Sequence, residues 1–145
     1  MSDCRKFSKI LVTVDGSEHS KNAADYAISL AIKCNSELVL LYVIPVDLRL
    51  FGYSPPSIED MKKEGQEYLD TIKLEVGEID KHIQVRTELI ASPSVVGGIV
   101  DFAERENIDL IVVGTKGRSG LKKLLLGSVA SGIINYAHCP VLISR

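Results

Sequence analysis

Short runs of β-branched and leucine residues alternate along this chain with longer segments whose apolar residues recur at helical spacing. The apolar runs lie at residues 9–15, 37–44, 83–89, 109–114 and 140–143. The helical segments lie at residues 17–34, 57–79, 92–106 and 127–138. Residues 45–56, with a glycine and several prolines, have the composition of a loop. This alternation predicts a parallel sheet that is covered by helices on both faces.

The composition of each apolar run predicts its place in the sheet. The runs at 9–15, 37–44 and 109–114 are apolar almost throughout, which is typical of strands buried on both faces. The run at 83–89 alternates apolar and polar residues, and the run at 140–143 is short, so both are expected at edges. With right-handed crossovers, these constraints predict an α/β fold with an open parallel five-stranded sheet in the order 3-2-1-4-5.

This Rossmann-like architecture fits the length of the chain, so residues 1–145 are expected to form a single domain. Seventeen basic and nineteen acidic residues nearly cancel, which argues against nucleic acid as a partner. No apolar run approaches the ~18 residues of a membrane span, and the polar Met1–Phe7 start lacks the apolar core of a signal peptide. The dispersed cysteines Cys4, Cys34 and Cys139 fit free thiols in a reducing compartment. A cytoplasmic protein is therefore expected.

The predicted strand order creates a crevice at one point of the sheet. The chain winds one way from the first strand to the second and the other way from the fourth to the fifth, so the first and fourth strands are neighbours. Open α/β sheets bind ligands at the carboxyl ends of the strands at such a switch point. The residues that follow these two strands are Asp15-Gly16-Ser17 and Gly114-Thr115-Lys116-Gly117, and both segments are polar and turn-like.

The second of these segments leads to a helix start at Gly127-Ser128-Val129. Helix N-termini present free N–H groups and a partial positive charge, which favour phosphate. Gly114 and Gly117 would let the backbone approach a ligand, and the hydroxyl of Ser128 can donate to it. Positive charge comes from Lys116, Arg118, Lys122 and Lys123. The alternative to a phosphate site is a solvated basic loop with ordinary turn glycines. The sequence contains neither a Walker A loop nor a GxGxxG motif.

The spacing Gly114-x2-Gly117-x9-Gly127-Ser128 resembles the nucleotide-binding signature of the ATP-binding branch of the universal stress protein family. The segments Lys9–Ser17, Leu40–Val43 and Pro140–Ile143 resemble other segments of that family, and the likeness extends from about Lys9 to Ser144. The resemblance implies a regulatory protein of the stress-response type that binds an adenine nucleotide, ATP first among the candidates. Mg²⁺ would be carried by the phosphates, because the sequence offers no protein-only metal site.

For the nucleoside, the resemblance implies roles for four residues. Asp15 matches the acidic residue that contacts the ribose end, and Val43 matches the strand residue whose backbone reads the adenine edge. Thr13 and Val14 would line the base pocket. Asp15 could instead be a helix-entry residue and Val43 a core residue. The family often has histidine where this chain has Tyr42, which would narrow the pocket if its ring pointed inward.

For the phosphates, the resemblance implies two groups of residues. Gly114 and Gly117 match the loop near the ribose and the phosphates. Gly127, Ser128 and Val129 match the phosphate cradle at the helix start. These are cofactor-binding assignments, and the sequence points to no catalytic residue.

Asp15 is the only acidic residue that the sequence places in the crevice, and no nucleophile–base pair accompanies it. In-line attack on a γ-phosphate needs metal, a positioned water and charge stabilisation, so little or no turnover is expected. An ATP-hydrolysing or phosphoryl-transfer enzyme and a dimeric interaction module with a vestigial nucleotide site remain alternatives. The apolar strand Val141–Ile143 is expected at an uncovered sheet edge, where a second copy could pair antiparallel in a homodimer.

Overall fold

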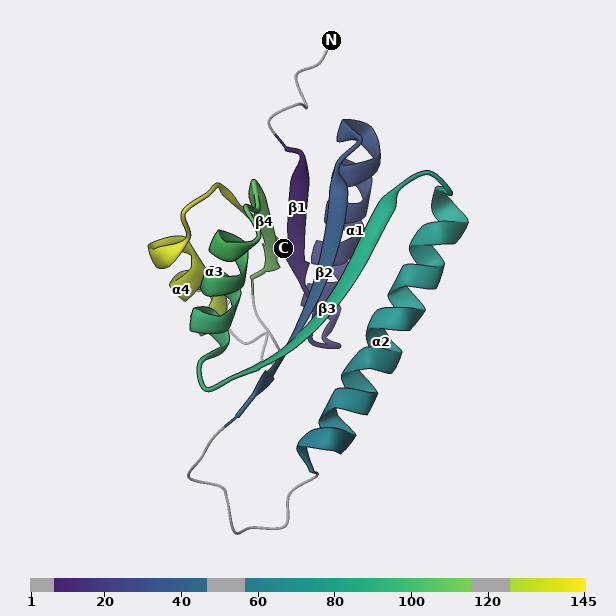
Figure 1. Cartoon of the computed structure of the whole chain (residues 1–145). Helices are drawn as coiled ribbons and strands as arrows, with labels where there is room; N and C mark the ends of the chain where they lie inside the picture. The colour runs from purple at the N-terminus through teal and green to yellow at the C-terminus, as the bar shows by residue number, and fades with distance from the viewer. Residues whose placement is uncertain (1–6, 47–56, 116–125) are drawn as a thin grey trace.

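The computed structural model describes residues 7–46, 57–115 and 126–145. Within these ranges the strands are β1 (Lys9–Thr13), β2 (Glu37–Pro45), β3 (Gln84–Ser92), β4 (Leu110–Gly114) and β5 (Val141–Ser144). The helices are α1 (Glu18–Cys34), α2 (Ile58–Ile79), α3 (Val95–Arg105) and α4 (Ser128–Tyr136). These strands pair in parallel in the order β3-β2-β1-β4-β5 (Figure 1), which confirms the predicted fold.

The core lies in two layers, one on each face of the sheet. α1 and α2 cover one face, and α3 and α4 cover the other (Figure 1). Along β1, Ile10 and Val12 belong to the layer beneath α1 and α2, and Leu11 belongs to the layer beneath α3 and α4. All three side chains are fully buried. A central strand of this sheet therefore needs apolar side chains at consecutive positions, as the sequence pattern predicts.

α1 packs closely on the sheet because small side chains face it. Ala23, Ala27 and Ala31 recur at every fourth position and have no exposed surface. The helix begins at the cap Ser17, whose side chain accepts a hydrogen bond from the backbone N–H of Ser20. The predicted start of this helix near residue 17 is therefore confirmed, and the start of α1 lies near the carboxyl ends of the central strands.

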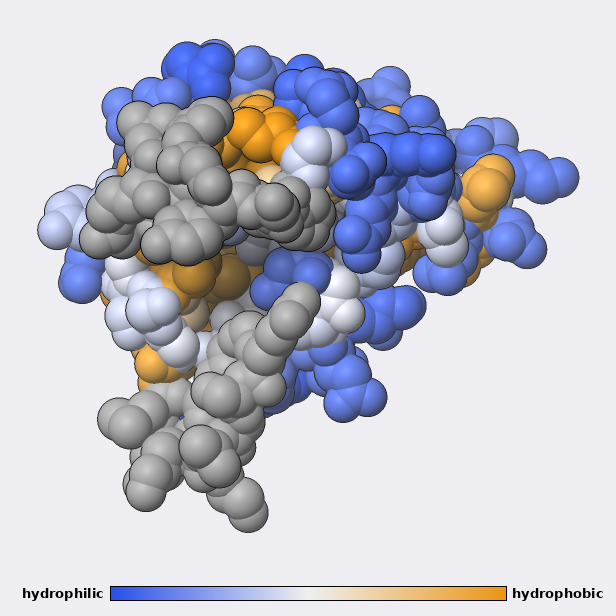
Figure 2. All heavy atoms as spheres, turned by 90° about the horizontal axis from the view of Figure 1, so that it is seen from below, coloured by the Kyte–Doolittle hydropathy of each residue, from blue (hydrophilic) through white to orange (hydrophobic). Residues whose placement is uncertain are grey.

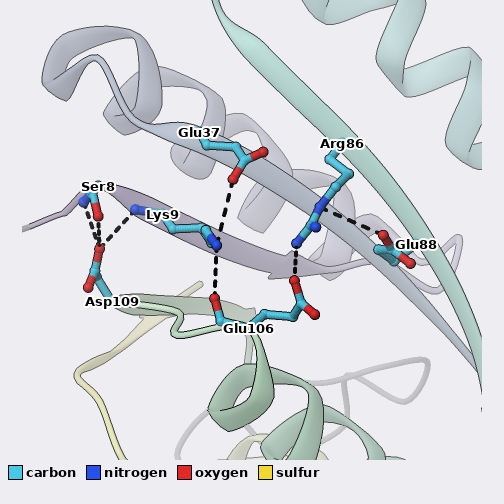
Figure 3. Close-up of polar contacts among 7 residues, drawn as sticks. All are labelled: Ser8, Lys9, Glu37, Arg86, Glu88, Glu106 and Asp109. Carbon is cyan, nitrogen blue, oxygen red and sulfur yellow. Dashed lines mark hydrogen bonds and ion pairs between the residues drawn. The ribbon is translucent and has the colours of Figure 1, made fainter.

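Charged side chains line one face of the edge strand β3 (Figure 3). Arg86 donates to the carboxylate of Glu106 over 2.7 Å and lies 3.7 Å from the carboxylate of Glu88. Lys9 donates to the backbone carbonyl of Glu106 over 2.9 Å and lies 4.0 Å from the carboxylate of Glu37. The hydrogen bond from Arg86 holds the pKa of Glu106 below its usual value. Through Arg86, the polar half of the alternating β3 pattern thus joins β3 to Glu106 at the end of α3.

α3 begins two residues later than the sequence predicts. The helical segment predicted from residue 92 does not begin there, because Ser92 is the last residue of β3, where it pairs with Pro45 and its carbonyl accepts from the N–H of Val46 over 3.0 Å. The cap is Ser94, whose side chain accepts from the N–H of Gly97 over 3.0 Å. β3 continues to pair with β2 as far as Ser92, so α3 starts later than predicted. Pro45 belongs to β2 and not to the loop predicted at residues 45–56. The rest of that loop, residues 47–56, lies outside the described residues.

The described ranges contain two of the three cysteines of the sequence. Cys34 and Cys139 are both free of disulfides there. Burial raises the pKa of the Cys139 thiol. The described residues contain no group of three or more His, Cys, Asp or Glu side chains that could hold a metal ion. None of the described helices is both long and apolar enough to cross a membrane.

Candidate functional site

β1 and β4 lie side by side in the middle of the sheet and end at the same edge (Figure 1). Ile10 pairs with Leu110 and Val12 with Val112, so the two strands run in register to that edge. Figure 2 looks onto this end of the molecule, where apolar surface lies among polar residues and atoms drawn in grey. The turn after β1 and the end of β4 therefore meet, as the sequence predicts. Gly117 and the four basic residues of the glycine-rich loop lie outside the described residues.

The turn after β1 is held by its own side chains. Oδ1 of Asp15 accepts from the backbone N–H of Ser17 over 2.9 Å. Gly16 has a φ of 88°, a conformation that favours glycine. Oγ of Ser17 accepts in turn from the N–H of Ser20 over 3.2 Å. Asp15 is exposed, so its carboxylate shapes the turn from a position at the surface.

The buried side chain of Ser20 holds this turn together, and Ser20 was not among the site residues predicted from the sequence. Its Oγ accepts from the N–H of Asp15 over 3.2 Å and donates to the carbonyl of Ser17 over 3.0 Å. Burial raises the pKa of the hydroxyl of Tyr68 in α2. The sequence carries no signal for the role of Ser20, because Ser20 has the spacing of an ordinary helix residue.

Gly114 ends β4 directly against the first turn of α1. A Cβ at this position would lie 2.7 Å from the backbone oxygen of His19 and 2.9 Å from its carbonyl carbon. Such distances are too short for real Cβ atoms, and the obstacle is backbone. The sequence suggests a glycine here for the approach of a ligand, whereas the close neighbour in the structure is α1. Gly114 therefore lets β4 and α1 meet at the switch point.

The start of α4 is tied to the end of β4. The N–H of Thr115 donates to the carbonyl of Ser144 over 2.9 Å, and the N–H of Gly127 donates to the carbonyl of Thr115 over 2.6 Å. Gly127 is the N-cap and brings no side-chain oxygen, and the first turn of α4 has no acidic residue. The N–H groups of Ser128 and Val129 have no acceptor within the helix. This helix end can therefore receive an anion.

The residues predicted at the base pocket point to different faces of the sheet. Side chains alternate along a strand, so Val43 shares the face of Leu41, beneath α3 and α4. Thr13 pairs with Leu41 and lies on the same face. Val14 is 3 % exposed in the layer beneath α1 and α2, so its side chain belongs to the core.

β2 continues past the end of β1, and this leaves the backbone of Val43 facing the crevice. The last paired residues of the two strands are Thr13 and Leu41. Beyond them, the carbonyl of Leu41 accepts from the N–H of Val14 over 2.9 Å. Because backbone groups alternate in direction along a strand, the N–H and C=O of Val43 point to the same side as that carbonyl. They lie past the β1 ladder, on the side where the turn after β1 begins.

Tyr42 points away from the face of Val43. Its ring makes a T-shaped contact with Tyr68, with centroids 6.4 Å apart and planes at 67°, and it packs against the layer beneath α1 and α2. α2 can lie close because Gly65 has no side chain, and a Cβ there would be 2.9 Å from the Tyr42 ring. Tyr42 therefore does not narrow the face that Thr13 and Val43 share.

A comparison with protein families decides the identity of this architecture. The model of the universal stress protein family matches residues 6–145, which is nearly the whole chain. The chain belongs to the universal stress protein family. The predicted resemblance to this family is confirmed over nearly the whole chain.

Two curated relatives of this universal stress protein cover almost all of its length. Universal stress protein MJ0531 of Methanocaldococcus jannaschii is 39 % identical over 143 residues, which are 96 % of this chain and 82 % of that protein. Universal stress protein YxiE of Bacillus subtilis is 37 % identical over 150 residues, covering 96 % of this chain and 99 % of that protein. The likeness to each relative thus extends over nearly the whole of this chain.

Solved structures of universal stress proteins share the fold. A family member from Burkholderia pseudomallei is 28 % identical with a TM-score of 0.75, covering 95 % of this chain and 96 % of that one. A universal stress protein in complex with cAMP is 24 % identical with a TM-score of 0.70, covering 97 % and 98 %. One from Archaeoglobus fulgidus in complex with dAMP is 22 % identical with a TM-score of 0.69, covering 96 % and 98 %. The last two likenesses concern the fold alone.

Proposed function

We propose that this universal stress protein binds an adenine nucleotide, ATP first among the candidates, across the carboxyl ends of β1 and β4. In this proposal it is a cytoplasmic regulatory protein of the stress response with little or no intrinsic turnover. The observation that carries the proposal is the start of α4, which the hydrogen bond from Gly127 to Thr115 holds at the end of β4. The fold is one in which family members are solved with cAMP and dAMP, which supports the ligand class.

The phosphates would bind at the start of α4. The N–H groups of Ser128 and Val129 lack helical acceptors, and Gly127 brings no side chain to occupy them. Ser128 is exposed, so its hydroxyl can donate as well. Gly114 and Gly117 would lie near the ribose and the phosphates. Mg²⁺ would arrive with the nucleotide, bound through phosphate oxygens.

The nucleoside would lie on the face that Thr13 and Val43 share. The carboxylate of Asp15 would accept from the ribose hydroxyls, and the Ser17 N–H already orients it. The backbone N–H and C=O of Val43 would read the adenine edge, which is why their direction past the β1 ladder supports the proposal. Thr13 and the backbone of Val14 would line the base pocket.

Little or no turnover is expected from this arrangement. Hydrolysis of a γ-phosphate needs a positioned water and charge stabilisation as well as metal. Oδ1 of Asp15 is engaged by the Ser17 N–H, so this carboxylate is poorly placed to act as a base on water. The N–H groups of α4 would stabilise charge, which favours binding without cleavage.

Isothermal titration calorimetry with ATP and Mg²⁺ tests the proposal. We expect saturable binding at one nucleotide per chain, weakened by Gly117→Val, which would block close approach of the backbone. Gly77→Val is the matched control, because Gly77 of α2 has open space where a Cβ would lie. Native mass spectrometry of freshly purified protein would identify any nucleotide carried through purification. If ATP, ADP, AMP and cAMP all give no heat, the proposal is refuted.

We also propose a homodimer through the edge strand β5. Among the described strands, β5 pairs with β4 alone. The carbonyl of Pro140 accepts from the N–H of Ile111 in β4, and the carbonyl of Ser144 accepts from the N–H of Thr115, the residue that follows β4. Backbone groups alternate in direction, so those of Val141 and Ile143 point away from β4. A second copy could pair there antiparallel about a two-fold axis.

Ile143→Pro tests the homodimer, because it removes one N–H from the outer side of β5 and leaves the bonds to β4. Ile143→Ala is the control, since it removes the side chain and keeps the N–H. Light scattering should report a dimer for the wild type and for Ile143→Ala, and a monomer for Ile143→Pro. A monomeric wild type would refute the dimer proposal. A dimeric Ile143→Pro variant would show that the dimer interface does not depend on β5.

A further inference from the structure

Two polar side chains at the carboxyl end of the sheet are buried without a hydrogen-bond partner. Within the described ranges, Nδ1 of His19 and Oγ of Ser144 are among the buried side-chain atoms that form no hydrogen bond. A third such atom, Nε of Arg86, has the carboxylate of Glu88 3.7 Å away, whereas Ser144 is only 2 % exposed and its hydroxyl has no charged neighbour of that kind in the described ranges. Buried polar atoms are nearly always hydrogen-bonded in folded proteins, so this pair calls for an explanation.

Both side chains lie beside Gly114, at the end of β4. Ser144 pairs with Gly114 in the parallel ladder, so its side chain is on the face that a Cβ of Gly114 would take. That Cβ would lie 3.1 Å from the Cβ of His19. Leu142, two residues before Ser144, packs in the layer beneath α1 and α2, which identifies the face. His19 and Ser144 therefore flank the same glycine on the same face of the sheet.

The flank of α1 that carries His19 is turned toward β5. Successive residues of a helix are about 100° apart, so His19 and Lys21 lie on opposite flanks of the buried Ser20. Lys21 lies 3.7 Å from the carboxylate of Glu75 of α2, and α2 is on the side of β3 (Figure 1). His19 is therefore on the flank away from α2. The imidazole and the hydroxyl of Ser144 thus approach the same space, one from α1 and the other from β5.

The two nitrogens of the His19 ring have different surroundings. Nε2 is not among the buried unpartnered atoms and forms no hydrogen bond with the described residues, so it is open to solvent. In a neutral imidazole one nitrogen carries the proton and the other accepts, and the hydrogen bond made by one nitrogen fixes the state of the other. A hydrogen bond from the Ser144 hydroxyl to Nδ1 would therefore make Nε2 a donor.

We propose that His19 donates from Nε2 to a phosphate oxygen of the bound nucleotide, and that Ser144 is the positioning residue that donates to Nδ1. The inference rests on the proposed function and deepens it, because it adds a side chain of α1 to the phosphate site. His19 lies against Gly114, and the next residue, Thr115, holds the start of α4 through its carbonyl. Both hydrogen bonds form when the nucleotide binds, so two atoms that are unpartnered in the free protein contribute to affinity.

Calorimetry with ATP and with adenosine tests the contact of His19. His19→Ala should weaken ATP binding about tenfold or more, the scale of a hydrogen bond to a charged group. It should leave adenosine binding unchanged, because adenosine has no phosphate. His19→Gln keeps an N–H donor near the position of Nε2 and should recover part of the lost ATP affinity. His82→Ala is the control, since His82 is exposed just before β3, at the amino end of the sheet, and it should match the wild type.

A double-mutant cycle tests the positioning role of Ser144. Ser144→Ala should weaken ATP binding about three- to tenfold, the scale of a neutral hydrogen bond. In a His19→Ala background the same substitution should cause no further loss, because Ser144 acts through the imidazole.

Urea denaturation of the nucleotide-free protein tests whether the Ser144 hydroxyl is unpartnered before binding. Removal of an unpartnered buried hydroxyl does not cost stability, so Ser144→Ala should be as stable as the wild type or more stable. Ser36→Ala is the matched control, because Ser36 is 3 % exposed and its hydroxyl donates to the carbonyl of Phe7. The control should be less stable than the wild type.

The outcomes separate the inference from the proposed function. ATP affinity equal to that of the wild type in His19→Ala or in Ser144→Ala, additive losses in the cycle, or equal losses with ATP and adenosine would overturn the inference and leave the proposed function standing. A clear loss of stability in nucleotide-free Ser144→Ala would also overturn it, because the hydroxyl would then already have a partner. A wild type that binds no adenine nucleotide would instead refute the proposed function, and the inference with it.

Discussion

α1 and α4 both begin at the carboxyl edge of the sheet, yet their N-termini are capped differently. α1 starts at Ser17, whose side chain accepts from the N–H of Ser20, and carries the acidic Glu18 in its first turn. α4 starts at Gly127, which has no side chain, and its first turn has no acidic residue. α1 therefore neutralises its own N-terminus, whereas α4 keeps donors and a partial positive charge for another group.

The difference assigns separate tasks to the two sides of the crevice. The capped start of α1, with the turn around Asp15, is rigid and presents a carboxylate. The start of α4 presents backbone donors. A nucleotide needs acceptors for its ribose hydroxyls and donors for its phosphates, so a pair of unlike helix starts suits it better than a pair of like ones.

The largest effect is expected where α1 rests on β4. Gly114→Ala places a Cβ against the backbone of His19 and should cost about 1–3 kcal/mol of unfolding free energy, as overpacking usually does. Urea denaturation measures the loss. Gly77→Ala, in open space on α2, should instead be neutral or stabilising by up to about 1 kcal/mol. Full stability of Gly114→Ala would mean that α1 can move off β4 without penalty.

Gly127→Asp would make the start of α4 resemble that of α1. The new carboxylate would accept from the first N–H groups and repel phosphate, so ATP affinity should fall at least about tenfold, or ~1.4 kcal/mol. Stability should rise by a few tenths of a kcal/mol or more, since an acidic residue favours a helix N-terminus. Gly127→Ala adds a Cβ without an acceptor and separates steric hindrance from capping in the same titration. Undiminished binding by Gly127→Asp would place the phosphates elsewhere.

Ser17→Ala would open the cap of α1. Loss of the bond to Ser20 should cost about 1 kcal/mol of unfolding free energy, measured by urea denaturation, and should weaken ATP binding through the turn around Asp15. Ser94→Ala at the start of α3 is the matched control, because its side chain accepts from Gly97 in the same way. The control should lose similar stability and keep its affinity. Equal ATP affinities of Ser17→Ala and Ser94→Ala would show that the cap of α1 does not contribute to nucleotide binding.

The smallest expected effect is on the pH dependence of stability, at the amino end of the sheet, which lies opposite the candidate site. Burial of Asp109 raises its pKa, but hydrogen bonds from the Ser8 side chain and from the N–H groups of Lys9 and Ser8 outweigh burial and lower it overall. The carboxylate therefore stabilises the fold above its unfolded pKa of about 4, and this contribution is lost as pH falls through the lower folded value. Thermal unfolding followed as a function of pH should show less acid sensitivity in Asp109→Asn than in wild type. The exposed Asp101→Asn should match the wild type.

The sequence was enough to predict the sheet but not every element boundary. The consecutive apolar residues of β1, β2 and β4 required burial on both faces, and that alone placed them at the centre. The helix was predicted from residue 92, but its cap is Ser94, so the structure selects the later of two nearby serines. The choice depends on how far β3 pairs with β2, which is a tertiary contact that local sequence does not encode.

The sequence predicted where the candidate site lies, but not the contacts that hold its residues in place. The polar turns after β1 and β4 follow from strand order, and the structure brings Asp15, Gly114 and Thr115 to one edge. The reason for Gly114 lies in the approach of His19 of α1, which is far from it in the chain, so spacing gives no sign of this contact. The N–H of Asp15 donates to the hydroxyl of Ser20, whose helical spacing does not reveal this role. The nucleotide-binding roles themselves remain predictions.

The bond between Gly127 and Thr115 has a consequence for engineering. It fixes both ends of the intervening stretch at one point, so a change in the length of that stretch need not disturb β4 or α4. Loop-closure entropy grows slowly, by about 0.6 kcal/mol for each doubling of length. A reporter peptide or a fluorophore attachment site could therefore be grafted between these two residues, beside the proposed nucleotide site, at small thermodynamic expense. Under the proposed function, such a graft would turn nucleotide binding into an optical signal.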